Sequence, residues 1–252
     1  MVAYALMALA RKYQVDSLYE SLVHRVKQEW PQTPEEYFRF VQDIKHTQQI
    51  FLNSSEDKIR YHYPVPEPAS VIRLSTDFDI PSVLPGAYYM LATIRRERQW
   101  QEDTSKMLQS YSALYARWQL LHDRDNMRYY QGLRALAVEI GRLETLWDEE
   151  AYGPMHLQNC KNASRNKGIV VSSPCEKAIS KCWSSHFEVE YNSMKEIVEV
   201  AHYPDPMKEL WELLGSCSAL QICSNCKSYT YRFLHRTIHD LWDTLPKMFG
   251  LM

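Results

Sequence analysis

The chain has 252 residues, of which 45% are hydrophobic and 24% are charged, and its 29 basic and 31 acidic side chains give a net charge of −2. This composition is typical of a globular protein and excludes a disordered one, and the near-neutral charge provides no general attraction to nucleic acid. Only 7 residues are glycine, which argues against phosphate-binding loops and against a turn-rich β-sandwich.

The first predicted unit is a helical hairpin over residues 6–30. Apolar residues recur at the spacing of one helical face: Leu6, Leu9, Ala10 and Tyr13 in the first helix, and Leu18, Leu22, Val26 and Trp30 in the second. Asp16 or Ser17 is expected to cap the second helix, since Ser17 and Glu20 have the spacing of a capping box. Because Met1 already lies inside this helical pattern, we expect the chain to be either a fragment of a longer protein or a truncated gene product.

A second hairpin, predicted over residues 69–96, repeats the first. Shifting the sequence by 65 positions places Leu9 on Leu74 and Tyr13 on Phe78, and it also places Val15, Ser17 and Leu18 on Ile80, Ser82 and Val83. Both copies therefore follow the order aromatic, polar, β-branched, turn residue, serine, aliphatic. Two copies indicate two related helical hairpins, which are too few for a solenoid.

The remaining pattern is also mainly helical, and it divides the chain into four predicted parts: residues 1–52, a linker at 53–67, a helical region at 68–150, and a cysteine-containing region at 151–252. Helices are expected from Thr33-Pro34 onward, over 105–150 with a break near His122, over 174–185, over 204–215 with Gly215 as its end, and over 233–242. Residues 169–171 are expected to form a short strand.

All six cysteines follow residue 159, and two of them form the motif Cys223-Ser224-Asn225-Cys226. Two thiolates at this spacing can reach one zinc ion, and a tetrahedral site needs two further ligands. Cys160 and Cys175 flank an irregular segment and are the expected partners, which makes the candidate metal site Cys160, Cys175, Cys223 and Cys226. Four protein ligands leave no position for water, so a bound zinc ion would be structural.

Other interpretations of these cysteines remain open. Cys182 is expected in the core, whereas Cys217 is either a core residue or a ligand in place of Cys160. Cys223 and Cys226 can instead combine with His235 and His239, or the chain binds no metal. The two cysteines of the motif are also spaced like a redox pair, but the strand that would precede such a pair in a thioredoxin-like unit is not predicted.

Three stretches together resemble a known family. Leu9-Ala10-Arg11-Lys12-Tyr13, leading to Val15-Asp16-Ser17-Leu18, resembles the closing helices of a BTB/POZ domain. Residues 79–89, Asp-Ile-Pro-Ser-Val-Leu-Pro-Gly-Ala-Tyr-Tyr, resemble the BACK-like helical region that follows the BTB domain in fungal BTB proteins. The tail that contains Cys223, Cys226 and residues 241–251 also resembles this region. The resemblance implies a helical protein-interaction module, sometimes an adaptor for cullin-type ubiquitin ligases. Because the front of the BTB fold is missing, the resemblance does not extend to dimerisation or to cullin binding.

We therefore expect a mainly α-helical, non-enzymatic protein that binds other proteins. It is expected to be intracellular, in the nucleus or the cytoplasm, because no apolar run can span a bilayer and the N-terminus lacks a signal-peptide layout. One alternative is a zinc-dependent nucleic-acid-binding protein that uses Lys161, Arg165 and Lys167, which the net charge disfavours. Another is a metal hydrolase that uses His235, His239 and Asp240, which would need an open coordination position.

Overall fold

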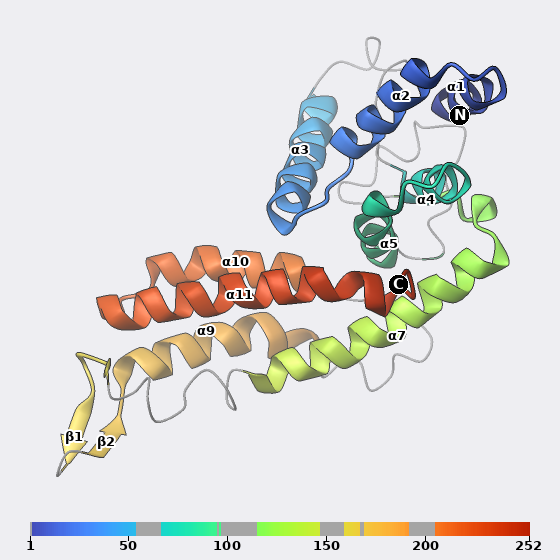
Figure 1. Ribbon diagram of the computed structural model, residues 1–252. Coiled ribbons are helices and arrows are strands. Elements are labelled where there is room, and N and C mark those ends of the chain that lie inside the picture. Colours follow the sequence, from blue (N-terminus) through green and yellow to red (C-terminus); the bar gives the residue numbers. More distant parts are fainter. Residues whose placement is uncertain are drawn as a thin grey trace. The chain divides into compact units, whose positions relative to one another are not determined.

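The computed structural model describes residues 2–53, 67–94, 96, 115–146, 159–166, 169–191 and 205–252, and it is mainly α-helical (Figure 1). The chain divides into two compact units. The first unit contains Met1–Leu133 and Thr244–Met252, and the second contains Arg134–Asp243. The four-part division expected from the sequence stays a prediction, and most of its 53–67 linker lies outside the described residues.

The helices of the first unit are α1 (Val2–Lys12), α2 (Asp16–Glu29), α3 (Pro34–Asn53), α4 (Pro68–Asp77), α5 (Leu84–Ala92), the short 3-10 helices η2 (Pro81–Val83) and η3 (Trp118–Leu120), and the start of α7 (Asp123–Leu146). The second unit contains the rest of α7, the strands β1 (Ser164–Asn166) and β2 (Ile169–Ser172), α9 (Pro174–Tyr191), α10 (Pro206–Ala219) and most of α11 (Ser224–Met248). None of the helices in the described parts is both long and apolar enough to cross a membrane.

The predicted repeat of the helical hairpin is confirmed by its backbone. Gln14 follows α1 with a φ of 54°, and Asp79, 65 positions later, follows α4 with a φ of 59°. The next amide in each copy bonds back five residues, from Val15 to the Ala10 carbonyl and from Ile80 to the Ser75 carbonyl, both at 2.9 Å. A left-handed residue with such a bond is a Schellman-type helix end, so both hairpins turn in the same way.

The two hairpins pack together around Phe78. The Tyr4 ring meets Phe78 edge-on with centroids 5.2 Å apart, and the Tyr19 hydroxyl donates to the Phe78 carbonyl at 2.7 Å. The Tyr4 hydroxyl donates to the Asp77 carboxylate at 2.7 Å, and Arg11 donates to the Asp77 carbonyl at 3.2 Å. One face of the α1–α2 hairpin therefore covers the α4–α5 hairpin.

The prediction that the apolar stripe of α1 packs into the core is wrong for three of its four residues. Met7 and Ala10 are buried, whereas Leu6, Leu9 and Tyr13 are 39%, 49% and 65% exposed. Spacing shows which residues share a helix face but does not show what covers that face. In α2 the predicted stripe is buried at Val26 and Trp30, and Leu18 at its start is 41% exposed.

The core of the first unit is centred on α5, whose sequence contains no charged residue. Tyr88, Tyr89, Met90 and Leu91 are completely buried, as expected for a helix that is apolar on all sides. The Tyr89 ring meets the Tyr37 ring of α3 edge-on, with centroids 5.3 Å apart. This contact anchors α3 to the core.

The predicted start of α3 is confirmed, whereas the predicted cap of α2 is wrong. Thr33 caps α3 by accepting from the Glu36 amide, and Asp205 caps α10 by accepting from the Lys208 amide. The predicted side-chain cap of α2 by Asp16 or Ser17 is wrong, because Val15 occupies the cap position and no side chain bonds there. The backbone bonds of the hairpin turn take its place.

Several predicted helix bounds also need correction. Residues 105–114 lie outside the described part, and 115–122 form a bridge and η3 before α7 begins at Asp123, close to the predicted break. Gly215 does not end α10, which continues to Ala219 and buries Cys217. The last helix begins at Ser224 rather than Phe233, so the Cys223–Cys226 motif lies at its start. The predicted strand at 169–171 is confirmed as β2, and it pairs antiparallel with β1, which was not predicted.

We expect Asp125→Ala to destabilise the first unit by about 2 kcal/mol, because Asp125 is 1% exposed and bonds two groups. One carboxylate oxygen accepts from the buried Tyr88 hydroxyl at 2.9 Å, and the other accepts from the His122 amide at 3.1 Å. Burial, and then the adjacent carboxylate, raise the pKa of Tyr88, so its hydroxyl stays a donor. Urea unfolding would measure the loss, and the exposed Asp123→Ala is the control; equal stability of both variants would contradict this role.

Candidate metal centre

Four cysteines meet in the second unit. The sulfur atoms of Cys160, Cys175, Cys223 and Cys226 all lie within 4.8 Å of one another, and three of these residues are buried while Cys223 is half-buried. They come from three segments: the turn after residue 159, the start of α9 and the start of α11. The structure thus brings together the four residues that the sequence singles out as metal ligands.

The start of α11 holds two of the sulfurs. Cys223 immediately precedes the helix and Cys226 lies in its first turn. The backbone amide of Cys226 donates to the Cys223 sulfur, so this sulfur acts as the helix cap. The positive end of the helix dipole lies at the same place and stabilises negative charge on the sulfur.

The start of α9 supplies the third sulfur. Ser173 precedes the helix and accepts from the Glu176 amide at 3.3 Å, so it caps α9 and places Cys175 in the first turn. The Cys223 amide donates to the Cys175 sulfur at 3.3 Å. Two helix N-termini are therefore joined at the cluster.

The segment around Cys160 supplies the fourth sulfur of the cluster. The Cys160 sulfur lies 4.0 Å from the Cys223 sulfur and 3.1 Å from the Ser173 hydroxyl. The Asn225 amide group donates to the Asn159 carbonyl at 2.9 Å, which fixes this segment against the first turn of α11. The β1–β2 hairpin lies between Cys160 and Cys175 in the sequence and is drawn beside the start of α9 in Figure 1.

The thiols of Cys175, Cys223 and Cys226 differ in acidity. Burial opposes ionisation of Cys223, but the amides of Cys226 and Lys161 donate to its sulfur and lower the pKa of Cys223 to about 6. Burial instead raises the pKa of Cys175 and of Cys226. At neutral pH Cys223 is therefore a thiolate, whereas Cys175 and Cys226 keep their protons in the absence of a cation.

This donor set can hold a metal ion. Four sulfurs around one tetrahedral zinc ion, at about 2.3 Å each, would lie about 3.8 Å apart. The observed limit of 4.8 Å is only slightly wider. A small inward movement of the side chains would close the site, and all four coordination positions would then be filled by protein.

The other cysteines and the histidine pair lie outside this cluster. Cys217 is buried in α10, which agrees with its core alternative and not with its ligand alternative, and burial raises its pKa to about 12, with a further contribution from Cys182. Cys182 is expected in the core but is only half-buried in α9. His235 and His239 have ring centroids 4.6 Å apart on α11. A helix rises about 1.5 Å per residue, so His235 lies about 13 Å along it from Cys226, and the mixed cysteine–histidine site is not formed.

The basic residues expected for nucleic-acid binding give no patch in the described residues. Lys161 donates to the Ser224 hydroxyl at 3.2 Å, at the edge of the cysteine cluster. The Arg165 side chain and Lys167 lie outside the described part. Asp240, the third residue of the hydrolase alternative, is exposed on α11.

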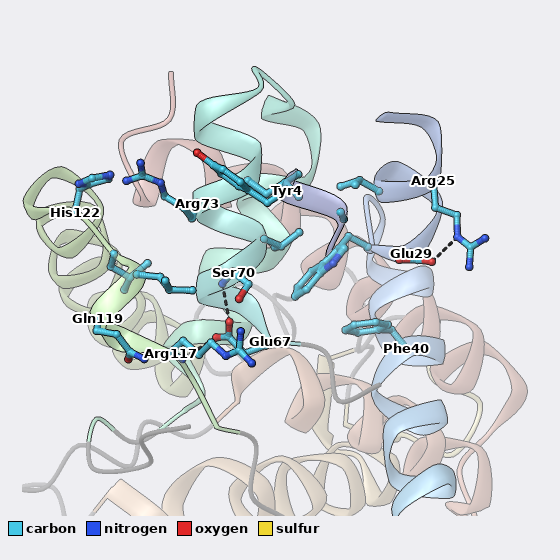
Figure 2. Close-up of a pocket in the computed structure, with 17 residues that line it drawn as sticks. Tyr4, Arg25, Glu29, Phe40, Glu67, Ser70, Arg73, Arg117, Gln119 and His122 are labelled. Atoms are coloured by element: carbon cyan, nitrogen blue, oxygen red, sulfur yellow. Dashed lines mark hydrogen bonds and ion pairs between the residues drawn. The ribbon is translucent and has the colours of Figure 1, made fainter. Parts of the chain in front are cut away.

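A groove of about 960 Å³ lies in the first unit (Figure 2). It is lined by residues of α1, α2 and α4, by Phe40 of α3, and by Arg117 and residues 119–122. Its carboxylate Glu67 accepts from the amides of Ala69, Ser70 and Arg117, at 2.7–2.9 Å, so it caps α4 and binds the neighbouring segment. Glu29, the other carboxylate of the lining, pairs with Arg25. The acidic groups of the groove thus serve structural contacts.

Comparisons of this chain with protein-family models, with curated proteins and with solved structures give no match.

We expect Zn²⁺ binding at neutral pH to release protons from at least Cys175 and Cys226, because their raised pKa values keep them protonated until the cation displaces the protons. Protons compete with the metal, so affinity should fall as the pH falls from 8 to 6, as measured by titration calorimetry in two buffers of different ionisation enthalpy. Cys223, with a pKa of about 6, should add to this dependence only near and below pH 6. An affinity independent of pH would contradict binding by these thiols.

Proposed function

We propose that this protein is a non-enzymatic protein-interaction module whose second unit is held together by a structural zinc ion. The observation that carries the zinc part is the meeting of the sulfurs of Cys160, Cys175, Cys223 and Cys226 within 4.8 Å. Zinc is the metal that four thiolates in tetrahedral arrangement favour. Because protein sulfurs would fill every coordination position, the ion would have no place for a water molecule or a substrate.

The zinc ion would organise a part of the chain with little core of its own. It would join the turn after residue 159 to the starts of α9 and α11. Because Cys160 and Cys175 would bind the same ion, the ion would also hold together the two ends of the segment that contains the β1–β2 hairpin. Metal binding to such sites contributes directly to folding. The ion would thereby fix the starts of α9 and α11. Further along, the two helices also contact each other through the rings of Trp183 and Phe233, whose centroids are 6.1 Å apart.

The interaction part of the proposal is supported by the surface of the α1–α2 hairpin. Six apolar residues of this one hairpin are 39–75% exposed, namely Val2, Leu6, Leu9, Tyr13, Val15 and Leu18. Extensive exposed apolar surface is a feature of protein-binding sites. The resemblance of residues 9–18 and 79–89 to BTB proteins agrees with such a role. All six cysteines are free thiols, in keeping with a reducing compartment such as the nucleus or the cytoplasm.

Elemental analysis of the purified protein tests the zinc assignment. We expect one zinc ion per chain, its loss in Cys223→Ser and Cys226→Ser, and its retention in Cys182→Ser, which removes a thiol outside the cluster. A protein that contains no zinc after purification, and that takes up none when Zn²⁺ is added under reducing conditions, would rule out the metal site. Loss of zinc in Cys182→Ser would show that the ion is held elsewhere.

Affinity capture with the full chain as bait, in the cells that produce it, tests the interaction part. We expect a protein partner at near-stoichiometric yield, and the zinc-free Cys223→Ser chain serves as a comparison for dependence on the second unit. Recovery of the chain alone would contradict an interaction function, whatever the metal content.

A further inference from the structure

The two copies of the repeated hairpin differ most clearly in the burial of one face. On this face, five apolar residues of one copy correspond to five of the other under the shift of 65 residues. They are Leu6, Leu9, Tyr13, Val15 and Leu18 in the first hairpin, and Val71, Leu74, Phe78, Ile80 and Val83 in the second. The first five are 39–65% exposed, and the second five are 0–7% exposed. Residues that face inward in both copies, such as Met7 and Ile72, are completely buried in each.

The second hairpin shows what covers such a face. Val71 and Leu74 line the groove of Figure 2 together with Tyr4 of α1 and Val26 of α2. Phe78 contacts the rings of Tyr4 and Tyr19, at centroid distances of 5.2 and 6.4 Å. The cover is thus the outer side of another helical hairpin, which brings one tyrosine from each of its helices.

The polar edge of the face has opposite charge in the two copies. In the second hairpin Asp77 accepts from the Tyr4 hydroxyl and from Arg73, both at 2.7 Å. The corresponding residue of the first hairpin is Lys12, whose ammonium group lies 5.3 Å from the centre of the Tyr13 ring. Arg73 belongs to α4 itself, so the cover contributes only the Tyr4 hydroxyl to the Asp77 carboxylate. A hairpin that covers the first copy would have to offer the opposite polarity at this position, a carboxylate facing the Lys12 ammonium group.

A second copy of this chain cannot cover the face in the way that α1–α2 covers the second hairpin. Its own covering residues, Tyr4 and Tyr19, are already used against Phe78. The equivalents of these tyrosines in the second hairpin, Ala69 and Leu84, are buried at 0% and 7% exposure. Within the part of the chain that the structure describes, the side that carries Tyr4 and Tyr19, and the equivalent side of the second hairpin, are therefore both already packed against other residues.

We infer that the exposed face of α1–α2, formed by Leu6, Leu9, Tyr13, Val15 and Leu18, binds a two-helix hairpin of a different protein, which places an aspartate or glutamate opposite Lys12. The bound hairpin would continue the stacking of hairpins that the chain already contains, and it would remove these five side chains from water. This inference rests on the proposed interaction function, for which it names the surface and the chemistry of the partner.

Site-specific photo-crosslinking in the full chain tests the inference. Leu9 is replaced by p-benzoylphenylalanine in the cells that produce the protein, and Met127, an apolar residue of α7 that is 73% exposed, is replaced in the control chain. We expect a covalent adduct with one other protein from position 9 and none from position 127. The attached peptide should belong to a pair of amphipathic helices with an acidic residue beside its apolar face.

The purified partner segment then allows a charge exchange. Leu9→Asp should weaken binding by about 30-fold or more, and Lys12→Glu by about tenfold. Replacement of the partner's carboxylate by lysine should restore binding to the Lys12→Glu chain. Both residues are exposed, so circular dichroism should show unchanged helix content in both variants.

Three results would overturn the inference: an adduct between two copies of this chain, equal adducts from positions 9 and 127, or a charge exchange that restores nothing. If affinity capture still returns a partner in these cases, the proposed interaction function stands and only the surface is wrong. If neither method returns a partner, both proposals fail.

Discussion

Cys226→Ser is expected to lower the melting temperature of the second unit by about 10 °C or more, and a chelator should have the same effect on the unaltered protein. Cys226 is one of four sulfurs that would bind a single ion, so its loss would free the turn after residue 159 and the starts of α9 and α11. Structural zinc contributes about 10–16 kcal/mol in small peptides. A loss of about 4 kcal/mol already corresponds to about 10 °C for a protein of this size.

The matched control for this substitution is Cys217→Ser. Cys217 is 3% exposed and Cys226 is 1% exposed, so both changes bury a hydroxyl in place of a thiol, but Cys217 lies outside the cluster. The difference in melting temperature between the two variants therefore isolates the metal. In addition, a chelator should not lower the melting temperature of Cys226→Ser further. Equal melting temperatures for both variants would mean that no ion stabilises the unit.

The cysteine cluster could be predicted from the sequence because its chemistry is specific to residue type and spacing. The pair at 223 and 226 fixes a ligand geometry, and Cys160 and Cys175 flank an irregular segment that a metal can order. The helix bounds near the pair could not be predicted in the same way. Cys223 serves both as a potential ligand and as the cap of α11, so the helix begins nine residues earlier than the apolar pattern after Phe233 indicates.

The repeat could also be predicted from the sequence, but the different burial of its two copies could not. The residues at positions 9 and 74 are both leucine, and the turns that follow have the same backbone. Nevertheless Leu9 is 49% exposed and Leu74 is 7% exposed. Burial depends on whether another element lies on the face, and this is a property of the assembled tertiary structure that local periodicity does not contain.

We expect Gly132→Ala to destabilise the first unit by about 3 kcal/mol. Gly132 lies in α7, and a β-carbon built there would overlap the ring of Phe249, which is completely buried. That ring has little room to move, because it stacks on the buried Tyr88 with centroids 5.4 Å apart. The turn after α11 also holds it, since Gly250 has a φ of 58° and the Leu251 amide bonds to the Pro246 carbonyl at 2.8 Å. Overpacking of a close-packed core by one methyl group typically costs about 1–3 kcal/mol, and a rigid aromatic neighbour places this site at the upper end.

Gly215→Ala is the matched control and should have the opposite sign. Gly215 lies within α10, is exposed, and has no atom within 4 Å of the position that a β-carbon would take. Alanine in place of glycine in an exposed helix interior stabilises by about 0.5–1 kcal/mol. Urea unfolding of both variants measures the contrast, and Gly132→Ala combined with Phe249→Leu should cost less than the sum of the two single changes, because the smaller side chain makes room for the methyl group. Destabilisation by Gly215→Ala equal to that by Gly132→Ala, or additivity in the double variant, would show that Phe249 does not lie against Gly132.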